Sequence, residues 1–427
     1  MVRSRKTGPP ATAPAPSERG AALLIVLLTV AVLTALTVDL AYNTRVSLEI
    51  AAHARDELKA TYMAKGAVNV ARLVLHFQRK LDSAGAIGSQ ALSQLGLGGQ
   101  TGAAGGGSSF SFRLWEVIPV DSTTVGALLG HRPAAADSKG GAKGAPAPKE
   151  PSFDAKIDDE DRKVNVAQLA GLSTVAAPQL QRFLLAVREP RYDVLFDRED
   201  ENGNRFTRRD LAVNLKDWVD EDSTTSTIGL NPAAPFENGF GDENYIYERL
   251  DDRYKAKNAP YDSQDELYLV AGVSDAFMAA FGDKLTVYPD VGAKINVNST
   301  DPAQLMLNAV LMSDPPGVPQ PALADPAFLT KLGAALALVR PLPFMSITPQ
   351  QFANVLVSLG VKVDPLYQQA LNSDSRSPFG NTSSTFSIHA VGTAGGVQKK
   401  IEAVVTFDRR AEALSQDLGR LLHWHEE

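Results

Sequence analysis

Residues 21–38, AALLIVLLTVAVLTALTV, decide the architecture of this chain, because they contain no charged residue, glycine or proline. At 1.5 Å per residue, a helix of this length reaches roughly 27 Å, which just spans the hydrocarbon core of a membrane. The segment before it is basic, with cations at Arg3, Arg5, Lys6 and Arg19. The positive-inside rule therefore predicts a single span with a cytoplasmic N-terminus and an exported remainder.

The same helix is expected to continue well beyond the apolar stretch. Between Asp39 and Leu81 the sequence has no proline and one glycine. Apolar residues recur there at spacings of mostly three and four: Val46, Ile50, Ala54, Leu58, Tyr62, Val70, Leu73 and Phe77. This pattern predicts one helix over residues 21–81, embedded in its first third, with an amphipathic stem that buries this stripe.

A basic leader ending in Arg19-Gly20, followed by an apolar helix and a stem, resembles the type IV pilin-like prepilins. The resemblance implies that a prepilin peptidase cuts between Gly20 and Ala21 and that Ala21 is then methylated. Most pilins and pseudopilins carry Glu at the fifth mature residue, where this chain has Ile25. A carboxylate in lipid is costly without a partner, which in a pilus is the N-terminus of a neighbouring subunit. Among pseudopilins, the lack of Glu at this position is typical of the general secretion pathway protein K family. Residues 19–75 resemble this family of minor pseudopilins over their whole length.

This resemblance implies an α+β fold. A long N-terminal helix, membrane-spanning in its first part, would pack on a small antiparallel sheet, with a large α-helical domain inserted between strands. The implied function is to cap the tip of the periplasmic pseudopilus of a type II secretion system and to aid protein export across the outer membrane. Ile25 would then mark a tip subunit with no neighbour above it. The implied partners are the I, J and H types of minor pseudopilin and the prepilin peptidase, with the anchor in the bacterial inner membrane.

A function of a different class stays open. A single-span, membrane-anchored periplasmic protein that senses or binds a ligand would also need an apolar N-terminal helix and an exported domain. Such a protein keeps its first twenty residues, whereas a prepilin loses residues 1–20 as a leader. The state of the mature N-terminus therefore separates the two hypotheses.

Composition divides the exported chain. Residues 82–109 are rich in Gly, Ala, Ser and Gln and predict a flexible linker, and a second low-complexity stretch covers residues 121–152. Phe110–Val120, Phe153–Ile157 and Lys163–Val166 read as strands of the first part of the sheet, residues 110–170. The acidic turn Asp158–Asp161 is expected to be a solvated hairpin.

Helical patterns dominate residues 171–378, the expected insert. They include Pro178–Val187, Arg209–Val219, Ser263–Ala271 and Ala276–Phe281, and two starts with capping residues before Pro302 and Pro349. Ser383–Ala390 and Lys399–Phe407 alternate around glycines and predict a hairpin within residues 379–410. Residues 411–427 are expected to form an exposed C-terminal tail that carries His423 and His425.

The densest acidic region, residues 217–252, is the candidate metal site. Calcium takes six to eight oxygen ligands from carboxylates, amide side chains and backbone carbonyls. Asp217, Asp220 and Asp222 lie at one helix terminus, and a glycine-bearing loop that could fold over them holds Asn238, Asp242 and Glu243. A solvated acidic helix end is the alternative. The resemblance implies calcium in this domain and favours Asp217 and Asp220 over the loop residues.

Other kinds of site find little support. The chain has no cysteine, which excludes disulfides, thiolate metal sites and a cysteine nucleophile. Its net charge of −7 does not favour a nucleic-acid partner. An EF-hand aligned on Gly203 would place Arg198 and Arg209 at ligand positions, so that hypothesis fails. The sequence contains no nucleophile elbow, phosphate loop or zinc-protease motif, and we expect no enzyme activity.

Overall fold

The computed structural model describes residues 16–83, 113–128, 150–196, 198–199, 203–231, 233–250, 252–289, 294–315, 320–340, 342, 344–368 and 377–427. Within these ranges, side chains are described from Gly20 onward, apart from those of residues 83, 128, 366, 368, 409 and 412. The start of the expected leader and most of both expected linkers lie outside these ranges, as do Phe110–Phe112 of an expected strand.

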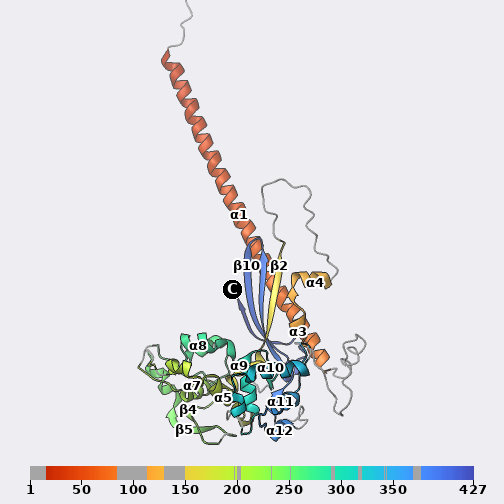
Figure 1. Cartoon of the computed structure of the whole chain (residues 1–427). Coiled ribbons are helices and arrows are strands. Elements are labelled where there is room, and N and C mark those ends of the chain that lie inside the picture. Colours follow the sequence, from red (N-terminus) through yellow and green to blue (C-terminus); the bar gives the residue numbers. More distant parts are fainter. Residues whose placement is uncertain are drawn as a thin grey trace, which may run out of the picture.

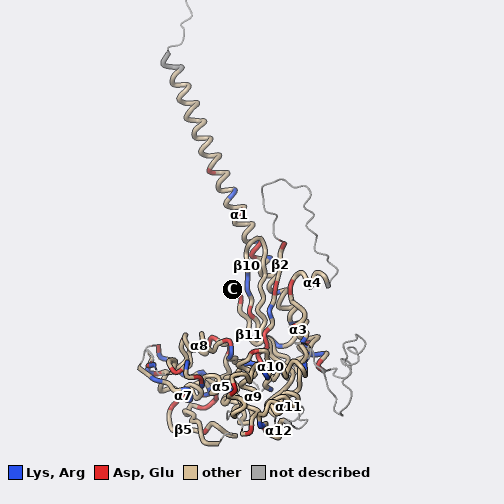
Figure 2. Tube along the Cα trace, viewed as in Figure 1, with Lys and Arg blue, Asp and Glu red and all other residues tan. Residues whose placement is uncertain are grey.

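The longest element is α1, Pro16–Ser83, which confirms the continuous helix expected over residues 21–81. Figure 1 shows it as a rod whose first half stands clear of the other elements. That half is long and apolar enough to cross a membrane, and none of its apolar window is buried within the chain. From Gly20 to Val38 the helix has no Lys, Arg, Asp or Glu, and Figure 2 shows the first charged positions farther along its free-standing part. The structure therefore fits a single-pass anchor.

The second half of α1 packs on a five-stranded antiparallel sheet with the order β1-β2-β9-β10-β11. Its strands are Val120–Asp121, Ser152–Asp159, Thr385–Ala394, Val397–Thr406 and Arg420–Glu426. β9 and β10 form the predicted hairpin, closed at Gly395 and Gly396, whose φ angles of 57° and 95° suit glycine. This arrangement confirms the expected α+β class.

The face of α1 that contacts the sheet is not the predicted one. Ala60, Ala64, Ala67 and Ala71 are completely buried, whereas Leu58, Tyr62, Leu73 and Phe77 remain 44–66% exposed. The reason lies in β9, where a Cβ on Gly392 would come within 2.5 Å of the backbone nitrogen of Ala64. Backbones that approach this closely leave room only for small side chains next to Gly392, and farther along α1 the sheet also covers Val68 and Leu75. Most of the predicted stripe therefore faces outward.

The C-terminal residues are ordered, which corrects the expected tail over 411–427. After the short helix α13, Arg409–Ala413, the chain forms β11, which pairs with β10 from Ile401↔Glu426 to Thr406↔Arg420. α1 secures this segment, because the Arg72 guanidinium donates to the carbonyl oxygens of Leu418 and Gly419 at 3.0 Å. His423 and His425 therefore belong to an edge strand.

The segment before β2 also differs from the prediction. Half of the described part of Phe110–Val120 is a short helix, α3, Leu114–Val117, and only Val120 enters β1. The ring of Trp115 packs edge-on against Phe386 of β9, with centroids 4.9 Å apart. Residues Ser122–Leu128, expected to begin a linker, form helix α4.

A large insert lies between β2 and β9 and is mostly helical, as predicted. Its α-helices are α5 Ser173–Ala186, α6 Asp193–Phe196, α7 Arg208–Asp217, α8 Asp275–Phe281, α9 Pro302–Met312, α10 Phe328–Val339, α11 Pro349–Ser358 and α12 Pro365–Gln368. Short 3-10 helices connect them: η1 Glu160–Arg162, η2 Ala167–Ala170, η3 Pro190–Tyr192, η4 Glu243–Tyr245, η5 Tyr247–Arg249, η6 Gln264–Leu269, η7 Gly282–Lys284 and η8 Pro321–Ala324. The predicted caps form, since Asp301 accepts from the Ala303 N–H and Thr348 closes a capping box with Gln351.

The insert also contains strands, which the helical prediction did not include. β4, Thr224–Ile228, and β5, Phe236–Asp242, form an antiparallel hairpin. Two parallel pairs join β3, Val164–Asn165, to β6, Leu285–Thr286, and β7, Ile295–Asn296, to β8, Phe379–Gly380. The insert has two hydrophobic cores, one around Phe183 and Trp218 and the other around Phe328 and Phe352.

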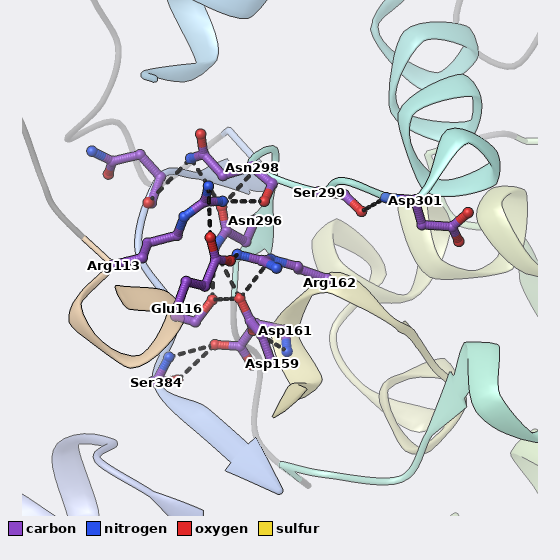
Figure 3. Close-up of polar contacts among 12 residues, drawn as sticks. Arg113, Glu116, Asp159, Asp161, Arg162, Asn296, Asn298, Ser299, Asp301 and Ser384 are labelled. Atoms are coloured by element: carbon purple, nitrogen blue, oxygen red, sulfur yellow. Dashed lines mark hydrogen bonds and ion pairs between the residues drawn. The ribbon is translucent and has the colours of Figure 1, made fainter. Parts of the chain in front are cut away.

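The acidic turn Asp158–Asp161 was expected to be solvated, and that expectation is wrong for three of its residues. Asp159, Glu160 and Asp161 are buried where the chain leaves the sheet for the insert. Asp159 lies 2.9 Å from the Arg162 guanidinium and accepts hydrogen bonds from Asn296 and, at 2.6 Å, from Ser383. Figure 3 shows Asp159, Asp161 and Arg162 next to Asn296 and Ser384, which come from two distant parts of the chain. Their partners lie far away in sequence, so local pattern could not reveal the burial.

Arg113 extends this network to α3. Its guanidinium donates to the Asn298 carbonyl oxygen at 2.7 Å and pairs with Glu116 at 3.0 Å, and Glu116 in turn pairs with Arg162 at 2.9 Å (Figure 3). Burial and the adjacent Asp159 raise the pKa of Asp161 to about 8. The two ends of the insert and the helix α3 are thus joined by one buried polar network.

Candidate metal centre

Three of the predicted ligands meet at the end of α7, in the part of the molecule farthest from the apolar end of α1 (Figure 1). α7 starts at a capping box formed by Thr207 and Asp210 and ends at Asp217. The β4–β5 hairpin folds back on this end, because the Ser226 N–H donates to Asp217 Oδ2 at 2.9 Å. One carboxylate oxygen each from Asp217, Asp220 and Glu243 lies within 4.8 Å of the others.

Buried oxygens without a donor distinguish this cluster from a solvated acidic helix end. Asp217 is 5% exposed and Glu243 is 6% exposed. Among the described residues, no hydrogen bond reaches Asp217 Oδ1, Asp220 Oδ1 or either Glu243 oxygen. Asn258, whose side chain lies beside Glu243, adds a further buried oxygen without a donor. Buried polar atoms are rarely left in this state, and a cation satisfies several acceptor oxygens at once.

The charges of the cluster do not balance. Three carboxylates face one ammonium, that of Lys216, which contacts Asp220 Oδ2 and lies 3.7 Å from Asp217 Oδ1. Burial raises the pKa of Asp217 and of Asp220. Burial, together with the nearby Asp220 and Asp217 charges, raises the pKa of Glu243 to about 7. The carboxylates therefore tend either to take up protons or to bind a cation. A divalent ion would bring the net charge of the three carboxylates and the ammonium near zero.

Aromatic residues pack together next to the carboxylate cluster. Trp218, next to Asp217, packs against Tyr247 at a centroid distance of 5.4 Å, and Tyr247 packs against Tyr254 at 5.3 Å. A cavity of about 380 Å³ opens beside Asp217 and Glu243. The carboxylates are thus fixed on a rigid base and reached through an open side.

The remaining predicted ligands have other roles in this structure. Asp222 Oδ1 accepts from the Thr224 N–H at 2.7 Å, and Asp242 Oδ1 accepts from the Asn244 N–H at 2.9 Å. Asn238 lies exposed on β5, paired with Ser226 across the hairpin. Lys216 and Asn258 were not predicted. Lys216 stands four residues before Asp220, a spacing that signals a helical ion pair, but no local signal marks Asn258.

The residues of the predicted processing site lie on α1, away from the metal cluster. Gly20, Ala21 and Ile25 are all exposed on its apolar first half. The helix is continuous through these positions.

Comparison with solved structures shows that this chain is similar to a chain of a bacterial secretion complex. No family model matches it, and no curated protein matches it. A chain in the crystal structure of the GspK-GspI-GspJ complex from the enterotoxigenic Escherichia coli Type 2 Secretion System is 15% identical, with a TM-score of 0.40. The match covers 67% of this chain and 84% of that chain. A likeness at this level does not by itself carry a function over to this chain.

Proposed function

We propose that this chain is a minor pseudopilin of a type II secretion system that caps the tip of the periplasmic pseudopilus and so aids protein export across the outer membrane. The observation that supports this most directly is the two-sided stem of α1. Its small residues are covered by the chain's own sheet, while a stripe of large apolar residues stays exposed: Leu58, Tyr62, Leu73 and Phe77.

The exposed stripe calls for a partner. Burying one large apolar side chain stabilises an interface by roughly 1.5–3 kcal/mol, so four of them supply a substantial hydrophobic contact. The stripe continues the axis of the membrane segment, so a partner that covers it fits best as another helix anchored in the same membrane. We propose that the stem helices of other minor pseudopilins, of the I, J and H types, cover this stripe.

The proposal includes processing and orientation. A prepilin peptidase would cut between Gly20 and Ala21 on the cytoplasmic side of the inner membrane, and Ala21 would be methylated. The exported part would lie in the periplasm, and Ile25 would leave the tip subunit without the carboxylate that pairs with a neighbour's N-terminus. We propose no catalytic role for the chain.

Mass spectrometry of the N-terminus of the membrane-extracted chain tests this proposal. We expect methylated Ala21 as the first residue in cells that contain a prepilin peptidase, and the uncut chain in cells that lack it. A Gly20→Val variant, with a bulkier residue at the proposed cleavage position, should remain uncut. Finding Met1 or Val2 at the N-terminus of the membrane form would instead favour the single-span sensor or binding protein.

We further propose that the cluster of Asp217, Asp220 and Glu243 binds calcium. Its donors are all oxygens, as a hard cation requires, and Asn258 can add one more. Mono- or bidentate carboxylates, with water from the adjacent cavity, would complete six to eight ligands. The bound ion would join the end of α7 to the end of β5 and so fix the hairpin.

Unfolding of the full chain in detergent, with calcium or with EDTA, tests the metal proposal. Ion binding to the native state should stabilise the insert by roughly 2–4 kcal/mol at saturating calcium. The combined Asp217→Ala and Asp220→Ala variant should lose this effect. Asp222→Ala is the matched control, because this nearby carboxylate lies outside the cluster and should leave the calcium effect intact. An equal calcium effect in all three proteins would contradict the site.

A further inference from the structure

The cluster contains a cation of its own, the side chain of Lys216. This side chain is 13% exposed, and its ammonium contacts Asp220 Oδ2 and lies 3.7 Å from Asp217 Oδ1. It therefore shares the two carboxylates that the proposed calcium ion would use. Among the described residues, no other Lys or Arg forms an ion pair with Asp217, Asp220 or Glu243.

Lys216 also contacts two side chains that carry no charge. Its ammonium donates to Ser226 Oγ at 2.7 Å and lies 5.7 Å from the centre of the Phe236 ring. Ser226 belongs to β4 and Phe236 to β5, so both contacts lie on the hairpin. A hydroxyl oxygen and an aromatic face can each hold an ammonium group that has moved off the carboxylates.

We propose that Lys216 is a built-in counter-ion that competes with the divalent cation for Asp217 and Asp220 and thereby lowers the calcium affinity of the site. This inference rests on the proposed calcium binding and adds its regulation. Without the ion, the ammonium compensates part of the carboxylate charge. With the ion bound, the ammonium moves away from Asp217 and Asp220 and keeps its contacts with Ser226 and Phe236, because two cations repel each other at this range.

A consequence follows for how the site works. Calcium proteins adjust their affinity through the number of charges around the ion. A fixed cation in contact with one of the three ligands weakens binding, so the site is loaded only when calcium is abundant. Loading and release then break and restore the contacts between the ammonium and the carboxylates, while Ser226 and Phe236 of the β4–β5 hairpin keep the side chain in place.

Isothermal titration of the full chain in detergent with CaCl₂ tests the inference through Lys216→Met, which removes the charge and keeps the length of the side chain. We expect the Kd for calcium to fall at least about tenfold. Lys331→Met is the matched control, since Lys331 also pairs with an acid, Asp325 at 2.6 Å, but belongs to α10. It should leave the Kd within about twofold of the original chain, as expected for a screened surface charge.

The outcomes separate the inference from the proposal on which it rests. If the original chain binds calcium as tightly as Lys216→Met, or more tightly, the proposed role of Lys216 is overturned. The calcium site itself would still stand. Absence of binding in every protein would overturn both. Lys216→Arg keeps the charge and covers the case in which Lys216→Met does not fold; a Kd about tenfold lower in this variant would also overturn the inference. A Kd within about threefold of the original chain would support it, because like charge then weakens binding equally.

Discussion

The contact between α1 and the sheet provides the sharpest test of the fold. Gly392 of β9 faces α1 so closely that a Cβ there would lie 2.5 Å from the Ala64 nitrogen and closer still to the Ala60 carbonyl oxygen. An ordinary contact begins near 3.4 Å and the Ala60 carbonyl oxygen would lie at 2.0 Å, so Gly392→Ala requires the helix and strand to separate by about 1.4 Å. Both contacted atoms belong to the backbone and cannot rotate away.

The cost of Gly392→Ala follows from this geometry. Overpacking a well-packed core costs typically 1–3 kcal/mol, and the rigid backbone atoms place this variant at the upper end, at about 3 kcal/mol. Chemical unfolding of the full chain in detergent, followed by circular dichroism, measures the change. Gly333→Ala in α10 is the control, because a Cβ there meets nothing within 4 Å. We expect the control to be neutral or to stabilise by up to about 1 kcal/mol, since alanine favours helix.

A small effect at Gly392 would refute the explanation given for the buried face of α1. If Gly392→Ala changed the free energy of unfolding by less than about 0.5 kcal/mol, the helix and sheet would not be in close contact. The complete burial of Ala60 and Ala64 would then need a different cause.

Three further predictions concern the metal site, the buried network and the stem. The raised pKa of Glu243, about 7 against an ordinary 4.5, means that the folded state binds the extra proton, so in EDTA stability should fall as pH rises from 5 to 7.5. Glu243→Gln should remove about 1–2 kcal/mol of this fall, allowing for solvent screening, as measured by unfolding at both pH values. Arg113→Met should cost about 2–3 kcal/mol, because it removes the buried donor to the Asn298 carbonyl oxygen and leaves Glu116 with Arg162 as an ion-pair partner. The exposed Lys156→Met should change unfolding by less than about 0.5 kcal/mol. Leu73→Glu should abolish co-purification with stem-containing partners yet leave the unfolding of the isolated chain within about 0.5 kcal/mol, since this side chain is exposed in the free chain.

The sequence predicted the elements of this fold better than their contacts. The absence of charge, glycine and proline from residues 21–38 was enough to identify α1, and the alternation around Gly395 and Gly396 was enough to identify the β9–β10 hairpin. The buried face of α1 was missed because alanine is a weak signal in any pattern of large apolar residues. Its burial is set by Gly392, more than three hundred positions away.

Charged residues show the same limit. Asp217 and Asp220 could be placed together because residues three positions apart lie side by side on a helix. Asp242 and Asn238 could not be excluded, because their exposure depends on how the β4–β5 hairpin turns. Asp159 was expected to be exposed to solvent. It is buried because Asn296 and Ser383, which are distant in sequence, pack against it and donate hydrogen bonds to its carboxylate.

The way in which the insert is connected to the sheet has a mechanical consequence. The chain enters the insert at the end of β2 and returns at the start of β9, and these two strands are neighbours that pair from Ser152↔Thr393 to Asp159↔Phe386. A pull on the insert therefore draws both strands in the same direction and does not slide one along the other. The tension passes instead to the ten-residue ladder between β9 and β10, where it acts as shear across many hydrogen bonds at once. The insert is thus attached in the orientation in which a sheet resists extraction most strongly.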